Sequence, residues 1–134
     1  MKIERYEHGD EGLARVYENA KWMVGVKNWK PANDIENLDC LERHNGTDEL
    51  FVLLDGACTL LFANEQNGKL AIEALKMVPK VVYNIPRSLW HNTVTEKTTK
   101  LLLVEDSSTS AANSDVISLS NEEREMVRKL VHET

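Results

Sequence analysis

Two turn dipeptides lie beside a short stretch of the chain that carries ionisable side chains, namely Glu42, His44 and Glu49. Asn45-Gly46 and Asp55-Gly56 are typical of two-residue hairpins, and such a hairpin fixes which side chains face one another. With these turns, Glu42 lies opposite Glu49 and His44 shares their face, which is otherwise apolar. Facing carboxylates beside apolar walls repel each other and lose hydration. The pattern therefore predicts a ligand site whose charge is offset by a metal ion, a shared proton or a nearby cation.

Strands are the elements that must position these residues. Apolar residues recur mostly at every second position, in short runs separated by turn residues such as Asn67-Gly68. Many short strands at this spacing are typical of a sandwich or barrel. Residues 106–115 are polar and small, which predicts a loop. We predict strands over residues 22–27, 35–43, 49–54, 58–63, 70–78, 81–85, 91–94 and 100–105.

A helix is predicted at the C-terminal end, over about residues 120–132. Ser120 and Glu123 have the spacing of a capping box, which marks a helix start. The apolar stripe that follows is narrow and suits packing on the outside of a barrel; it comprises Met126, Val127, Leu130 and Val131. We expect one domain over residues 1–134, with a barrel core over about residues 20–106.

Composition narrows the classes of partner. The 16 basic and 22 acidic residues give a net charge of -6, which argues against a non-specific nucleic-acid binder or an anionic-membrane binder. A small molecule is the expected ligand. We expect neither a transmembrane segment nor a signal peptide. Cys40 and Cys58 form no C-x-x-C pair, so we expect two reduced thiols and a cytoplasmic protein.

The opposite side of the same strands is also apolar, and it would be costly to leave in water. It carries Leu50, Val52, Leu54 and Leu61. A second sheet, the C-terminal helix or an identical subunit could cover it, and we favour a homodimer. If the first predicted strand runs on to Trp29, Lys27 lies on the same face of the strand as Trp29 and could bind an anionic group of a ligand. The alternative is that Lys27 is exposed to solvent.

Two blocks of residues resemble the motifs of the cupin superfamily. The first cupin motif has two histidines one residue apart, then a glutamate, and a glycine after six further residues. The corresponding positions in this chain are Glu42, His44, Glu49 and Gly56. The second motif resembles the stretch 86–91, from Pro86 to His91. A downstream asparagine of the family is replaced by Thr95. The resemblance covers residues 35–105 and implies an all-β, antiparallel jelly-roll barrel.

The resemblance also implies a metal site. Cupins often hold one Mn, Fe, Ni, Zn or Cu ion on three histidines and a glutamate. His44, Glu49 and His91 match three of those ligands, while Glu42 replaces the first histidine and is a candidate fourth ligand or catalytic base. Two imidazoles and a carboxylate suit a divalent transition metal and leave positions open for water or substrate.

Three functions are compatible with these residues. The first is a metal-dependent enzyme, an oxidoreductase or isomerase, whose ion polarises a substrate oxygen or binds dioxygen. The second is a metal-free sugar ketoisomerase or epimerase, because residues 81–92 also resemble the cupin sugar ketoisomerases; His44 or His91 would move the proton, with Tyr83 as a partner. The third is a non-catalytic binding or sensor domain.

Overall fold

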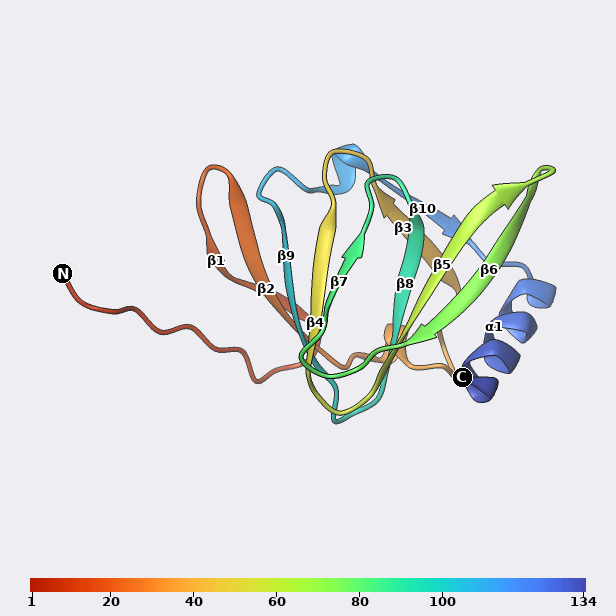
Figure 1. The fold of residues 1–134 in the computed structure, drawn as a ribbon, viewed down its shortest axis with the longest axis horizontal. Coiled ribbons are helices and arrows are strands. Elements are labelled where there is room, and N and C mark those ends of the chain that lie inside the picture. Colours follow the sequence, from red (N-terminus) through yellow and green to blue (C-terminus); the bar gives the residue numbers. More distant parts are fainter.

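The computed structural model describes residues 1–134 as two antiparallel sheets that face each other, with one helix (Figure 1). The first sheet has the order β1 (Leu13–Glu18), β2 (Trp22–Asn28), β9 (Lys100–Asp106), β4 (Glu49–Asp55) and β7 (Val82–Ile85). The second has the order β10 (Ser114–Ser118), β3 (Cys40–His44), β8 (Trp90–Thr95), β5 (Cys58–Gln66) and β6 (Lys69–Lys76). Short 3-10 turns lie at Pro31–Asn33 and Ala111–Asn113. The predicted all-β class is confirmed.

Alternation of side chains along the strands produces two separate apolar cores. One lies between the sheets and contains buried residues of β2, β4, β5, β7 and β9, such as Phe51, Leu60 and Leu103. The other lies on the outer face of the second sheet, where Leu41 and Leu61 pack with Val127 of the helix. The second sheet is therefore covered on both faces.

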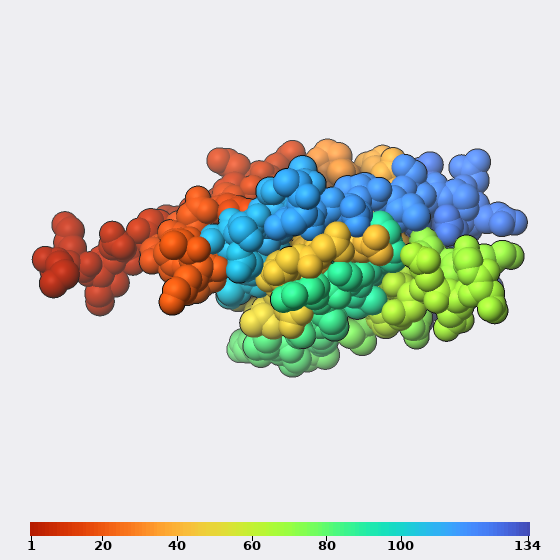
Figure 2. All heavy atoms as spheres, turned by 90° about the horizontal axis from the view of Figure 1, so that it is seen from above, coloured from red at the N-terminus to blue at the C-terminus, as the bar shows by residue number.

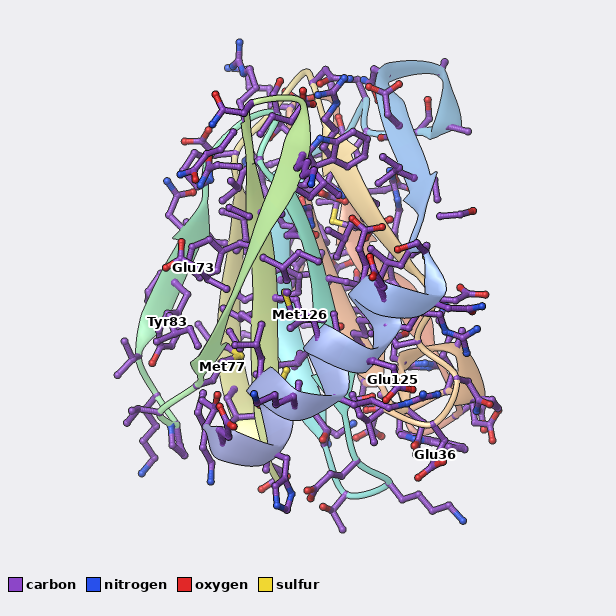
Figure 3. The ribbon with its side chains drawn as sticks, turned by 90° about the vertical axis from the view of Figure 1, so that its right-hand side faces the viewer. Glu36, Glu73, Met77, Tyr83, Glu125 and Met126 are labelled. Carbon is purple, nitrogen blue, oxygen red and sulfur yellow. The ribbon has the colours of Figure 1, made fainter.

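The C-terminal helix α1 (Asn121–Glu133) has the predicted start and position. The Ser120 side chain accepts a hydrogen bond from the Glu123 backbone N–H, and the Glu123 side chain accepts one from the Ser120 backbone N–H. These two bonds form the predicted capping box. Figure 3 shows the helix lying across the outer face of the sheet that contains β6.

The three predicted hairpin turns have different outcomes. Asn67-Gly68 joins β5 to β6, with positive φ angles at both residues and Gln66 paired to Lys69, as predicted. The other two predictions are wrong, because β4 lies in the first sheet while β3 and β5 both lie in the second. The chain at Asn45-Gly46 and at Asp55-Gly56 crosses from one sheet to the other. A two-layer fold closes by such crossings, and a turn dipeptide does not distinguish them from hairpins.

Two edge strands were not predicted, and one predicted strand is too long. β1 and β10 lie at the edges of their sheets, and β10 begins within the region predicted to be a loop. Residues 35–39 form turn and irregular structure, so the strand predicted over 35–43 begins only at Cys40. β1 and β10 contain no buried residue, so their apolar alternation is weak.

The predicted second apolar face is divided between the two sheets. Leu61 is fully buried beneath the helix. Leu50 and Leu54 lie on the outer face of the first sheet, where they are exposed together with Val82. Leu61 is separated from Leu50 and Leu54 because β5 and β4 lie in different sheets and do not form the predicted hairpin. No helix or second sheet covers the outer face of the first sheet around Leu50, Leu54 and Val82, whereas Tyr6 of the N-terminal segment packs on Tyr17 of β1.

Other sequence expectations concern the cysteines and the membrane. Both cysteines are free, as predicted, and Cys58 is buried in the core between the sheets. No helix is both long enough and apolar enough to cross a bilayer. The residues that precede β1 have no regular structure, and their N-terminal end projects from the body of the molecule (Figures 1 and 2). Nearer to β1 this segment is attached to the body, because the Tyr6 ring packs against Tyr17 and the His8 carbonyl oxygen accepts hydrogen bonds from Asn28 and Lys100.

Candidate metal centre

The two sheets bring ionisable side chains together in the interior. β3 supplies Glu42 and His44, and β8 supplies His91, whose Cα pairs with that of Glu42. From the facing sheet, Glu49 begins β4 and pairs with Glu105 of β9. Directly paired residues in an antiparallel ladder point to the same face, so each sheet presents its own ionisable pair to the other.

The nitrogen and oxygen atoms of these side chains lie within a few ångströms of one another. His91 Nε2 is 3.0 Å from Glu49 Oε1, and His44 Nε2 is 3.5 Å from the same oxygen. Glu42 Oε1 is 3.9 Å from His44 Nε2 and 4.0 Å from His91 Nε2. Glu105 Oε2 is 3.9 Å from His44 Nε2. The structure therefore brings together all four residues that the sequence suggested as metal ligands, and it adds Glu105.

The cluster is buried on every side except at Glu42. The side chains of His91, Glu49 and Glu105 are only 2%, 6% and 6% exposed, and that of His44 is 13% exposed. Glu42 is 39% exposed. Access from solvent is therefore past Glu42.

Hydrogen bonds fix the orientation of both imidazoles. His91 Nδ1 is 2.9 Å from the Leu89 carbonyl oxygen, and because a carbonyl only accepts, Nδ1 carries a proton. In neutral His91 the Nε2 lone pair then faces Glu49 Oε1, so two acceptors would meet at 3.0 Å. A proton or a cation must relieve this contact. His44 is held by Ser114 Oγ, 2.8 Å from its Nδ1, and leaves Nε2 facing the cluster.

Burial and mutual charge shift the pKa values of the cluster. Burial raises the pKa of Glu49, but hydrogen bonds from His44 and His91 outweigh burial and lower it to about 2. For Glu105, burial and the neighbouring charge of Glu49 raise the pKa to about 7. The hydrogen bond to Glu49 raises the pKa of His44 in spite of burial.

Glu105 was missed as a site residue in the sequence. It lies on the buried face of β9, which also carries Leu101 and Leu103 at alternate positions. A carboxylate that continues an apolar alternation was the available signal, as it was for Glu49. The buried oxygen Glu105 Oε2 has no hydrogen-bond partner.

Tyr83 is not part of the cluster. It packs against the core between the sheets, and its hydroxyl accepts a hydrogen bond of 2.8 Å from the Val78 backbone N–H. Figure 3 shows Tyr83 on β7, near Met77. No hydrogen bond joins Tyr83 to His91, whose ring nitrogens face the Leu89 carbonyl oxygen and Glu49, so the structure does not show the predicted partnership in proton transfer.

The donor set fits a divalent transition metal ion. Two overlapping groups share His44, one with Glu42 and His91 and the other with Glu49 and Glu105, and within each group the ligand atoms lie within 4.8 Å of one another. Imidazole nitrogens and carboxylate oxygens are the ligands of Mn, Fe, Ni, Cu and Zn sites. The Nδ1 bond of His91 to a backbone carbonyl is a common way of orienting a metal-binding imidazole. The unpartnered oxygen of Glu105 requires a cation beside it or a proton on its carboxyl group.

Comparisons with known proteins give matches in structure only. No protein-family model and no curated protein sequence matches the chain. A cupin-2 domain protein from Shewanella frigidimarina superimposes with a TM-score of 0.52 at 15% identity, over 74% of this chain and 84% of that one. KdgF from Halomonas gives 0.50 at 12% identity, over 77% and 87%.

A further match covers more of the chain. A variant of PAC13 from Streptomyces, solved with uridine, has a TM-score of 0.59 at 8% identity, over 92% of this chain and 98% of that one. Sequence identities this low support a similarity of fold and do not indicate a shared function. The predicted jelly-roll architecture is confirmed, and the chain has the cupin fold.

Proposed function

We propose that the chain binds one divalent transition metal ion through His44, Glu49 and His91, with Glu42 as a fourth ligand, and uses it in small-molecule catalysis. The observation that carries the proposal is the contact between His91 Nε2 and Glu49 Oε1 at 3.0 Å. The proton on His91 Nδ1 leaves two acceptors facing each other there. Two ligands each about 2.1 Å from a shared ion lie at about this separation.

The bound ion would act as a Lewis acid toward a substrate oxygen. The chain's own residues have separate tasks. Leu89 and Ser114 hold the two imidazoles in place, and the apolar core between the sheets limits water around them. Glu42 is the one exposed carboxylate of the cluster, so it is placed to exchange a proton with a substrate that arrives from solvent.

Calorimetric titration with Mn²⁺, Fe²⁺, Ni²⁺ and Zn²⁺ after removal of metal by a chelator tests the proposal. We expect one ion per chain in the wild-type protein and loss of binding in His44→Ala and His91→Ala. His132→Ala is the matched control, because His132 lies in the last turn of α1, away from the cluster. Wild-type protein that binds none of the four ions would overturn the proposal.

A metal-free isomerase or epimerase is the second candidate. The hydrogen-bonded pair His91 and Glu49 could move a proton without a metal, with Glu49 holding the imidazolium. The match to PAC13 with uridine suggests nucleoside-linked sugars as ligands to test. Chelator-treated protein that binds uridine diphosphate glucose would favour this function. Binding of small molecules without turnover would favour a sensor.

We also propose a homodimer and a cytoplasmic location. Leu50, Leu54 and Val82 form an exposed apolar region on the outer face of the first sheet, and an identical subunit is the occupant that we favour. The cytoplasmic proposal follows from two free thiols.

A further inference from the structure

The turn at residues 86–89 joins β7 of the first sheet to β8 of the second. The Leu89 backbone N–H donates a hydrogen bond of 3.1 Å to the Pro86 carbonyl oxygen, and this bond closes the turn. The carbonyl oxygen of Leu89 in turn accepts the bond of 2.9 Å from His91 Nδ1. The position of this turn therefore sets the orientation of the His91 imidazole.

Two further hydrogen bonds attach the turn to the other strands that carry ligands. The Ser88 backbone N–H donates to the carbonyl oxygen of His44, the last residue of β3, at 2.8 Å. The Arg87 backbone N–H donates to Asp48 Oδ1, also at 2.8 Å, and Asp48 directly precedes Glu49, the first residue of β4. One turn therefore ties together the three strands that carry the proposed ligands.

Ser88 has a backbone conformation that its residue type disfavours. Its φ is +67°, in the left-handed region, at the third position of the turn, where glycine is usual. Its hydroxyl donates a hydrogen bond of 2.8 Å to Asn45 Oδ1. A strained conformation persists only where its surroundings hold it, so loss of one attachment will let the turn relax. Such a movement shifts the Leu89 carbonyl oxygen and, with it, the His91 ring.

We propose that Asp48 is a positioning residue of the metal centre, whose bond to the turn keeps the His91 ring where Nε2 and Glu49 Oε1 can share one ion. The inference rests on the proposed function, because it takes these two groups as ligands. Asp48 is exposed, and its carboxylate bonds to the turn and, at 3.4 Å, to Asn84 Nδ2 rather than to the cluster. Loss of a partner that orients a metal-binding imidazole costs about 10- to 100-fold in metal affinity.

Calorimetric titration with Mn²⁺ and NMR of the metal-free protein test the inference together. Asp48→Ala should weaken Mn²⁺ binding about 10-fold or more, and it should speed the exchange of the His91 Nδ1 proton with water by a similar factor, because the bond to Leu89 loosens. Asp48→Asn removes the charge but keeps an acceptor oxygen, so both values should stay within about threefold of the wild type. Asp55→Ala, at an exposed carboxylate at the opposite end of β4, is the matched control and should behave as wild type.

The outcomes separate this inference from the metal site. If Asp48→Ala leaves Mn²⁺ affinity unchanged, whatever its effect on the free energy of unfolding, Asp48 has only a structural role and the inference is overturned. If Asp48→Asn weakens Mn²⁺ binding as much as Asp48→Ala does, the charge of Asp48 is responsible, and the inference is overturned as well. If the wild type binds none of Mn²⁺, Fe²⁺, Ni²⁺ and Zn²⁺, the proposed function fails. The proton exchange rate in Asp48→Ala then still decides whether Asp48 positions the His91 ring.

Discussion

At position 42 a carboxylate occupies the place of a histidine in the cupin motif, and its Cα pairs with that of His91. Its oxygen lies within 4.0 Å of both imidazole nitrogens. A carboxylate can therefore replace the missing imidazole as a ligand while adding negative charge to the cluster. The expected consequence is a site that favours harder divalent ions such as Mn²⁺ and Fe²⁺.

Substitution of Glu42 tests its role as a ligand. Glu42→Gln should weaken Mn²⁺ binding by about 10- to 100-fold or more. Loss of a hydrogen-bonding partner of a metal ligand already costs this much, and loss of a ligand should cost at least as much. Glu42→His should retain binding and shift the preference from Mn²⁺ toward Zn²⁺ and Ni²⁺, which suit imidazole. Competition titrations measure both effects. Equal Mn²⁺ affinity in wild type and Glu42→Gln would show that Glu42 is not a ligand.

Glu105 makes the stability of the metal-free protein depend on pH, and the raised pKa of Glu105 determines the sign of that dependence. Folding raises the pKa of Glu105 from 4.5 to about 7. Below pH 4.5 the Glu105 carboxyl is protonated in both the folded and the unfolded chain, so it does not reduce the free energy of unfolding at those pH values. As the pH rises toward 7, the unfolded chain releases the proton first, and the folded state loses stability. In chelator, Glu105→Gln should raise the free energy of unfolding by about 1–3 kcal/mol at pH 8 and by little at pH 4.

Urea denaturation at the two pH values measures this difference. Glu122→Gln, at an exposed position in the first turn of α1, is the control for a change of net charge. If Glu105→Gln changed the free energy of unfolding by the same amount at both pH values, the assignment of a raised pKa to Glu105 would be contradicted.

His44 and Glu49 show what residue patterns could predict. Their convergence was predicted from a hairpin that does not exist, yet the face of each strand was identified correctly because alternation alone determines it. Which strands pair was not available from the turns. Glu105 was missed because a single carboxylate at the end of an apolar strand also suits a solvated strand end.

At the scale of elements, the crossing at Gly56 is the most constrained connection. Gly56 has a φ of +71°, and a Cβ there would lie 2.7 Å from the backbone of Thr98. Gly56→Ala should therefore cost about 2 kcal/mol or more, through strain and the close backbone contact. Thermal denaturation measures the loss. Gly68→Ala is the matched control: it has a positive φ of +76° but open space, so it should cost about 1 kcal/mol. Equal losses would refute the steric argument.

The predicted elements differ from the observed ones in ways that have physical causes. The helix and the central strands other than β3 have strong periodicity, because their buried faces are wide, and they were predicted close to their observed bounds. The edge strands β1 and β10 have few buried residues, so their patterns are weak. Asn67-Gly68 was predicted correctly because β5 and β6 are adjacent in one sheet, whereas Asp55-Gly56 connects two sheets.

At the scale of the molecule, the outer face of the first sheet is the surface most in need of a partner. Trp22, Leu50, Leu54 and Val82 are exposed there, whereas the helix covers the other sheet. We predict a dimer in light scattering after size exclusion, and a monomer for the double variant Leu50→Glu with Val82→Glu. Val116→Glu, an exposed apolar residue of β10 in the other sheet, is the control. A monomeric wild type would contradict the dimer.

X-ray absorption at the metal edge of the Zn²⁺-loaded protein tests the central claim most directly, because it reports the ligands themselves. We predict a first shell of nitrogen and oxygen at about 2.0–2.1 Å, with outer-shell scattering from two imidazoles that falls to one in His91→Ala. A spectrum without imidazole scattering, or one that His91→Ala leaves unchanged, would contradict a metal centre built on His44 and His91.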